Sequence, residues 1–200
     1  MARDTTRPHA AARWLETSRG VLSYTELAPL LAERVLRVQQ RLETGTHAAH
    51  ALDDELLLQL HGEFCGDLVP EWAGRWRTIA VRVGQHEPPA PHLVPMLIRD
   101  YGLNLQARLT SRPSDPDLLP EHLAYAEGRF LTIHPFRDFN GRLIRLWLWE
   151  ILRRLNLPPL DLVPTQPQDT ATYLAALQAY DDNQPQPLIT LWQQRLNQLS

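Results

Sequence analysis

One stretch decides how this chain folds: His134-Pro135-Phe136-Arg137-Asp138-Phe139-Asn140-Gly141-Arg142-Leu143-Ile144-Arg145. Pro135 ends any helix that reaches His134, because proline disfavours helical backbone in the residue before it. A second helix is expected to begin near Asn140 and to run to about Leu155. The stretch therefore predicts two helices joined by a short loop that presents polar side chains beside a helix N-terminus.

Apolar residues flank this loop at helical spacing. A stripe with spacings of 4, 3, 4 and 3 precedes it, and a wider apolar face follows it. A helix that is apolar over so much of its girth should be central and buried. The stripe before the loop consists of Leu119, Leu123, Ala126, Phe130 and Ile133, and the wider face of Ile144, Leu146, Trp147, Leu148, Ile151, Leu152 and Leu155.

The remaining segments predict a mainly α fold with one small β element. Period-two alternation predicts a strand over Arg77–Val83, with a turn at Gly84 and only a short return strand among the prolines that follow. Helical spacing elsewhere predicts five further helices. They are expected over residues 21–42, 46–64, 93–109, 169–180 and 187–199.

Composition excludes several classes of function. The net charge of −3 over 200 residues argues against a general nucleic-acid binder. All 20 basic residues are arginine, which excludes Schiff-base and phosphate-loop lysine chemistry. A single cysteine cannot form an internal disulfide, and no apolar run approaches membrane-spanning length or the core of a signal peptide. We therefore expect a cytoplasmic protein with no membrane partner.

The start of the helix at Asn140 has the properties of a phosphate site. The first N–H groups of a helix have no internal partners and carry partial positive charge. Gly141 lets a ligand approach the backbone closely, and a diphosphate suits such a terminus. Arg142 and Arg145 lie on one face of the same helix, and their guanidinium groups can bind phosphate oxygens in pairs.

Two residues of the loop can supply the remaining chemistry. Asp138 is a hard oxygen ligand, suited to a Mg²⁺ ion that bridges phosphates. Histidine has an unperturbed pKa of about 6.5, which suits a base that works near neutral pH, so His134 is the candidate base. Together these residues indicate that a nucleoside triphosphate is held by its phosphates while a hydroxyl loses its proton to His134 and attacks phosphorus in line.

The stretch resembles the signature of the Fic (filamentation induced by cAMP) or Fic/Doc family, H-P/x-F-x-D/E-G/A-N-G/K-R-x-x-R, at every position except Phe139. The resemblance implies a helical bundle around a central helix, ATP and Mg²⁺, and transfer of AMP to a serine, threonine or tyrosine hydroxyl of a target protein. By matching position, His134 would be the base and Asp138 the metal ligand.

The same resemblance implies roles for the other motif residues. Asn140 and Gly141 would contribute to the phosphate cradle, and Arg142 would grip the phosphates. Arg145 would complete the anion site or brace its loop. Flanking segments, Trp72–Thr78 and Tyr173–Leu177, are similar to family segments as well. The predicted domain spans 21–200, with a core of about 60–192 behind a tail over 1–20.

The predicted hairpin resembles the flap of the family. In that family the flap pins a target segment by strand addition, which draws affinity from the main chain. Ile79, Val81 and Val83 would then form the target-binding flap. The target protein itself and the oligomeric state are left open by the sequence.

Phe139 departs from the family pattern within the nucleotide-binding loop, where the family has glycine or alanine. A left-handed backbone and close ligand approach are both penalised for phenylalanine. The ring could occlude the phosphate, or it could swing away and leave the backbone amides usable. The alternatives to AMP transfer are therefore a degenerate member that binds without transfer and a relative that transfers another phosphate-containing group.

Regulation in many relatives depends on a helix with the pattern Ser/Thr-x-x-x-Glu-Gly/Asn, whose glutamate pairs with the second motif arginine. The nearest string here is Gln39–Thr44, which keeps the glutamate and lacks both flanking preferences. The resemblance thus offers Glu43 as a candidate inhibitory clamp on Arg145. A separate antitoxin protein, or silencing by Phe139, is the alternative.

Overall fold

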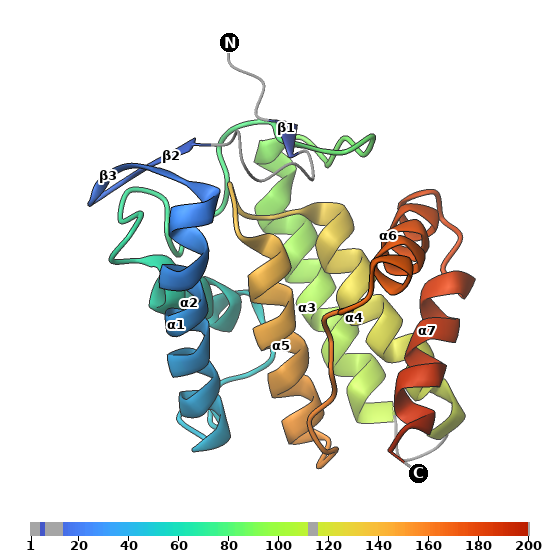
Figure 1. Cartoon of the computed structure of the whole chain (residues 1–200). Coiled ribbons are helices and arrows are strands. Elements are labelled where there is room, and N and C mark those ends of the chain that lie inside the picture. Colours follow the sequence, from blue (N-terminus) through green and yellow to red (C-terminus); the bar gives the residue numbers. More distant parts are fainter. Residues whose placement is uncertain (1–4, 7–13, 112–115, 200) are drawn as a thin grey trace.

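The computed structural model describes residues 5–6, 14–111 and 116–199 of the 200-residue chain. Within them the structure is a helical bundle with short strands gathered at one end (Figure 1). The helices are α1 (Tyr24–Glu43), α2 (Asp54–Cys65), α3 (Val94–Ser111), α4 (Leu119–Ile133), α5 (Asn140–Arg154), α6 (Pro167–Asp181) and α7 (Gln186–Asn197). The strands are β1 (Thr5–Thr6), β2 (Trp14–Thr17), β3 (Gly20–Ser23) and β4 (Arg82–Val83).

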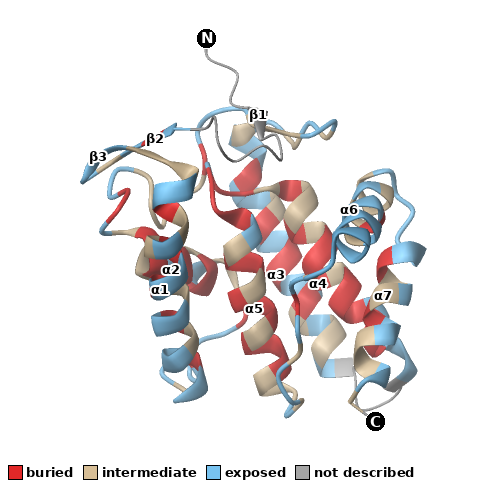
Figure 2. Cartoon of the chain, in the orientation of Figure 1, coloured by how far each residue is buried: buried red, intermediate tan, exposed pale blue. Residues whose placement is uncertain are grey.

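Helix α5 is the centre of the bundle, as its apolar girth predicts. It packs against α1, α2 and α4, and buried residues cover most of its length (Figure 2). Trp147 donates its indole N–H to the Tyr101 hydroxyl at 2.8 Å, and that hydroxyl donates to the carbonyl of Ala126 at 2.8 Å. This buried chain joins α5 to α3 and α4, so it fixes the register of three helices.

Helices α6 and α7 cover the opposite side of α4. Glu127 of α4 is buried and accepts hydrogen bonds from the Tyr173 hydroxyl at 2.7 Å and the Trp192 indole at 2.8 Å. Arg195 lies 3.3 Å from the same carboxylate. Since a buried carboxylate is tolerated only when it is paired, Glu127 anchors both C-terminal helices to α4.

The N-terminal region differs from the expected tail over 1–20. Trp14–Thr17 and Gly20–Ser23 form an antiparallel hairpin with Trp14 opposite Ser23, and Gly20 has φ +94° in the turn. Ser23 then caps α1 in a reciprocal capping box with Glu26. The short strands carry little apolar alternation, which is why periodicity does not reveal them. Most of residues 1–12 lies outside the described residues, but Thr5–Thr6 pairs in parallel with β4.

The predicted strand over Arg77–Val83 is wrong for most of its length. Only Arg82–Val83 forms a strand, and Ile79 and Val81 lie in irregular backbone. The turn at Gly84 is present, with φ +59°, and the return is a single bridge between Val83 and His86. We keep the name flap for residues 79–90. The physical reason for the missing strand is that a buried guanidinium, Arg77, binds backbone carbonyls on both sides of the flap.

The predicted helix over 46–64 begins later than expected. Asp53 caps α2 with its side chain, which accepts the N–H of Leu56 at 3.2 Å. Residues 44–50 form turns, and Gly45 has φ +74°. The Asp53 carboxylate is therefore a helix start signal.

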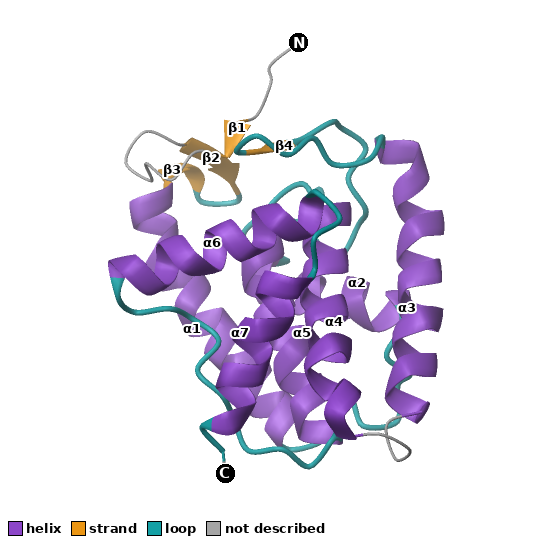
Figure 3. Cartoon of the chain, turned by 90° about the vertical axis from the view of Figure 1, so that its right-hand side faces the viewer, coloured by secondary structure: helices purple, strands orange, loops and turns teal. Residues whose placement is uncertain are grey.

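The α4–α5 loop, the β2–β3 hairpin and the flap lie at the same end of the bundle (Figures 1 and 3). None of the helices in the described part of the chain has the length and apolar character needed to cross a membrane.

Candidate functional site

The α4–α5 loop is bounded by two left-handed residues, neither of which is glycine. His134 caps the end of α4 with φ 49°, and its N–H donates to the carbonyl of Phe130 at 2.9 Å. Phe139 precedes the first turn of α5 with φ 63°. Left-handed backbone costs roughly 1–2 kcal/mol for an L-residue, so other contacts must hold this loop.

Asn140 is one of those contacts. Its side-chain oxygen accepts the N–H of Phe136 at 3.0 Å, and its amide group donates to the carbonyl of Phe136 at 2.9 Å. The side chain is 1% exposed. Asn140 therefore clamps the loop from inside, and any role in a phosphate cradle falls to its backbone N–H.

The ring of Phe139 points into the core of the molecule. It is 4% exposed and packs against the rings of Trp72 at 5.5 Å, Phe64 at 6.1 Å and Tyr24 at 6.4 Å between centroids. By contrast, a Cβ built on Gly141 would meet no atom within 4 Å. The space beside the backbone at the start of α5 is thus open, and the aromatic ring does not fill it.

Asp138 precedes Phe139 in the motif loop and is buried. One carboxylate oxygen accepts the N–H of Phe139 at 2.7 Å, and the other accepts the hydroxyl of Tyr24. An ionised carboxylate has about four lone-pair positions, so the same group can accept hydrogen bonds and coordinate a cation. Among the described residues no group of three or more His, Cys, Asp and Glu side chains gathers. Asp138 thus fits a Mg²⁺ ion that takes most of its ligands from phosphates and water.

His134 is half-buried at the C-terminal end of α4. Its Nδ1 lies 3.3 Å from the carbonyl of Leu131. A carbonyl can only accept, so this contact favours the tautomer with its proton on Nδ1, in which Nε2 is the nitrogen that can accept a proton. That tautomer is the one required of a base that acts through Nε2.

Arg142 and Arg145 lie on the first turns of α5, both half-buried. Burial lowers the pKa of the Arg142 guanidinium, an effect that Asp138 opposes and Arg145 reinforces. The Arg142 guanidinium carbon also lies 5.8 Å from the Phe139 ring centroid. The structure therefore brings His134 and Asp138 to the start of the helix that carries both arginines, as the sequence predicts.

His61 of α2 is a supporting residue that the sequence analysis missed. Its Nδ1 accepts the N–H of Gly74 at 3.0 Å, so its Nε2–H donates to the carbonyl of Asp138 at 3.2 Å. The ring stacks on Phe136 with centroids 3.9 Å apart. Burial lowers the pKa of His61 to about 4, although the bond to the Asp138 carbonyl opposes the shift. His61 is therefore neutral and holds the motif loop against α2.

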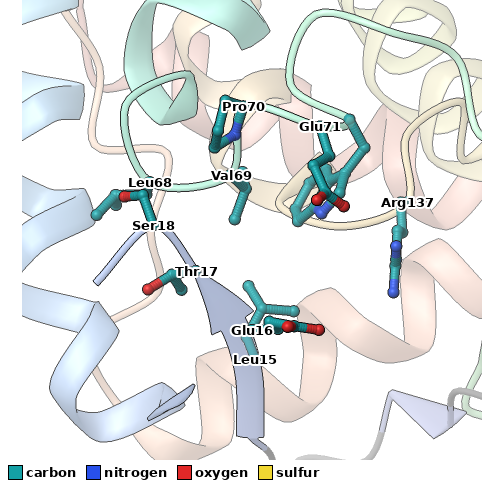
Figure 4. Close-up of a pocket in the computed structure, with 10 residues that line it drawn as sticks. Leu15, Glu16, Thr17, Ser18, Leu68, Val69, Pro70, Glu71 and Arg137 are labelled. Atoms are coloured by element: carbon teal, nitrogen blue, oxygen red, sulfur yellow. The ribbon is translucent and has the colours of Figure 1, made fainter. Parts of the chain in front are cut away.

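A small cleft opens beside the motif loop. Its volume is about 160 Å³, and it lies between β2, the turn at residues 68–72 and Arg137 (Figure 4). Arg137 is exposed, and its guanidinium carbon lies 5.7 Å from the ring of Trp72, the ring that also covers Phe139. Ser18 ties the hairpin to this turn by donating its N–H to Leu68 at 2.8 Å. The hairpin that the sequence analysis missed thus forms one wall of the site region.

Glu43 is not brought to Arg145. It is the last residue of α1 and lines a separate cavity with Trp149 and Arg153. Arg153 lies eight residues beyond Arg145, roughly 12 Å along the axis of α5. The structure therefore gives no support to Glu43 as an inhibitory clamp.

Of the flap residues, Ile79 is 40% exposed and Val81 and Val83 are half-buried. They lie beside β4 at the same end of the bundle as the motif loop, as the resemblance implies, although only Val83 belongs to a strand.

Comparison with curated proteins finds relatives in animals that are named protein adenylyltransferases. It is 35% identical over 133 residues to protein adenylyltransferase fic-1 of Caenorhabditis elegans, which covers 66% of this chain and 24% of that protein. It is 32% identical over 125 residues to protein adenylyltransferase Fic of Nematostella vectensis. That match covers 62% of this chain and 27% of the relative. The chain thus spans about a quarter of the length of these relatives.

Solved structures show the same fold. The BepC protein of Bartonella tribocorum with bound AMPPNP superposes with a TM-score of 0.70 at 16% identity, covering 90% of this chain and 91% of that one. An N-terminal Fic domain of Bartonella quintana with bound ADP superposes with a TM-score of 0.69 at 19% identity. The match covers 94% of this chain and 92% of that domain. The family model described as Fic/DOC matches residues 51–152, just over half the chain. The chain belongs to the Fic/DOC family.

Proposed function

We propose that this protein is an adenylyltransferase that moves AMP from ATP to a hydroxyl side chain of a target protein. One observation carries the proposal. The ring of Phe139 is buried against Trp72 and Phe64, and the space at Gly141 is open. The replacement of the family glycine therefore leaves room for a phosphate at the start of α5.

The residues of the site divide the work. The first N–H groups of α5, with Arg142 and Arg145, bind and orient the phosphates. His134 takes the proton of the target hydroxyl through Nε2. The hydroxyl oxygen then bonds to the α-phosphorus, the bond from this phosphorus to the bridging oxygen breaks, and diphosphate leaves. Mg²⁺, where Asp138 holds it, would neutralise phosphate charge.

The flap supports a protein target. Thr5–Thr6 pairs in parallel with Arg82–Val83, which shows that β4 can pair with an extended segment. A target segment that takes the place of Thr5–Thr6 would gain main-chain hydrogen bonds without strict sequence requirements. Relatives named protein adenylyltransferase favour the same class of partner.

The test is transfer of label from α-labelled ATP in the presence of Mg²⁺ and a cell lysate. We expect labelled protein bands with the wild-type chain and at least a hundredfold loss with His134→Ala, because the base supplies roughly 10²–10⁴-fold in such reactions. His92→Ala, which changes an exposed histidine outside the site, is the matched control. Undiminished labelling by His134→Ala would contradict the role of this residue.

A second candidate is a member that binds nucleotide without transfer. The Tyr24 hydroxyl favours it, because it already occupies one oxygen of the Asp138 carboxylate. Calorimetry with ATP, combined with the labelling test, separates the two candidates. ATP binding without labelling of any target would support the member that binds without transfer. Mass spectrometry of a modified target distinguishes AMP from another phosphate-containing group. The antitoxin partner and the cytoplasmic location stay predictions.

A further inference from the structure

Arg77 is a buried guanidinium whose hydrogen bonds go to backbone carbonyls. It is 3% exposed. Nε donates to the carbonyl of His134 at 2.7 Å, and Nη2 lies 3.3 Å from that of Ile133. The other donations reach the flap, from Nη1 to Ile79 at 3.1 Å and from Nη2 to Pro89 at 2.5 Å. One side chain thus joins both ends of the flap to the residue proposed as the base.

The charge of Arg77 is suited to this place. The carbonyls of Ile133 and His134 are the last of α4, where the helix dipole is negative and a cation is stabilised. Burial lowers the pKa of Arg77, but arginine remains charged. Its planar fork carries five N–H donors in fixed directions, so it can bind carbonyls on two sides at once.

A second side chain, His86 of the flap, also binds the end of α4. His86, which pairs with Val83 in the flap turn, has its Nε2 at 2.9 Å from the carbonyl of Thr132, two residues before His134. The backbone N–H of Arg77 also donates to the carbonyl of Pro135 at 2.9 Å. The flap is therefore fastened along residues 132–135, the segment that carries the imidazole.

We propose that Arg77 is a positioning residue that sets the flap at a fixed distance from His134, so that a target segment added to the flap presents its hydroxyl to the base. This inference rests on the proposed function. It assigns to Arg77 a role in the use of the protein target, and none in the binding of ATP, because its contacts reach the flap and the end of α4.

The decisive variant is Arg77→Lys, with Arg75→Lys as the matched control. Lysine keeps the positive charge at the end of α4, but a single ammonium cannot span carbonyls on both sides. Arg75 is exposed and lies two residues away. We expect kcat/KM for the target to fall about tenfold or more while the KM for ATP stays within about twofold, since small misplacements cost large factors in rate. Arg75→Lys should resemble the wild type.

Amide hydrogen exchange provides a measurement independent of transfer. In Arg77→Lys, amides of the flap should exchange at least tenfold faster, while those of α5 keep their wild-type rates. If Arg77→Lys does not fold, the same exchange measurement is made on Arg77→Gln, which is uncharged but keeps amide donors. Unchanged flap exchange, or a KM for ATP that rises as much as kcat/KM for the target falls, would overturn the proposal. Absence of transfer by the wild-type protein would instead overturn the proposed function, and the fastening of the flap would then be judged by exchange alone.

Discussion

At the scale of single residues, Phe139 shows how a motif position can change without loss of the site. A left-handed backbone usually selects glycine, yet the ring gains burial against three aromatic side chains. Removing a buried phenylalanine costs about 3–5 kcal/mol, and relief of left-handed strain returns about 1–2 kcal/mol. We therefore expect Phe139→Gly to lower the free energy of unfolding by about 2 kcal/mol in a denaturant titration. A more stable variant would show that the ring is strained and the packing adds little.

Gly141 provides the complementary prediction. A Cβ there meets no protein atom within 4 Å, so Gly141→Ala should leave stability unchanged or raise it by up to about 1 kcal/mol, since alanine favours helices. The family pattern admits lysine at this position, so the N–H of residue 141 should be open to a phosphate with or without a Cβ. We expect the Kd for ATP in calorimetry to stay within about twofold of the wild type. A tenfold weaker affinity, roughly 1.4 kcal/mol, would mean that the phosphate approaches the Cβ side of residue 141.

At the scale of elements, the loop between α4 and α5 is held by its neighbours. His61 from α2 and Asn140 from α5 bind its backbone, and Arg77 binds the end of α4. None of these contacts depends on an ion pair, so the loop geometry should be insensitive to salt. The loop should, however, be sensitive to acid, because His61 is a buried group that can take up a proton.

His61 gives the loop a predictable pH dependence. Its pKa is about 4 in the folded protein and about 6.5 when unfolded, so the unfolded state binds more protons between these values. The contribution of neutral His61 to the free energy of unfolding is complete above pH 6.5 and is lost as the pH falls toward 4. Protonation of the unfolded state should thus remove about 2 kcal/mol from the unfolding free energy between pH 7 and pH 5.

The measurement is thermal or chemical unfolding of the wild type, His61→Gln and His92→Gln at both pH values. Glutamine does not titrate, so the stability difference between the wild type and His61→Gln should shrink at pH 5. His92 is exposed, and its variant should follow the wild type. A difference between wild type and His61→Gln that is constant with pH would mean that His61 titrates normally in the folded state.

At the scale of the whole molecule, the order of helices and the central place of α5 follow from local sequence. Apolar spacing before and after Pro135 predicts α4 and α5 closely, and the resemblance assigns the residues around His134 to one site. What local sequence could not predict depends on distant partners. Phe139 points inward because Tyr24, Phe64 and Trp72 come together from separate segments, and Arg77 replaces strand pairing by binding carbonyls up to 57 residues away.

The supporting residues were hidden for the same reason. His61 lies on an apolar helix face between Leu57 and Phe64, a position typical of a buried core histidine, and its partner is a backbone carbonyl 77 residues away. Every residue has a backbone carbonyl, so the pattern of side chains cannot indicate which carbonyl will be the partner. The hairpin over 14–23 is likewise fixed by its turn and by Ser18, and its strands are too short for a periodic signal.

The central claim is that a nucleotide can occupy the start of α5 although phenylalanine replaces the family glycine. It is tested most directly by a crystal structure with a non-hydrolysable ATP analogue and Mg²⁺. The account predicts phosphates at the backbone N–H groups of Asn140 and Gly141, with the Phe139 ring still packed on Trp72. A Phe139 ring turned into that space, with no nucleotide bound at saturating concentration, would contradict it.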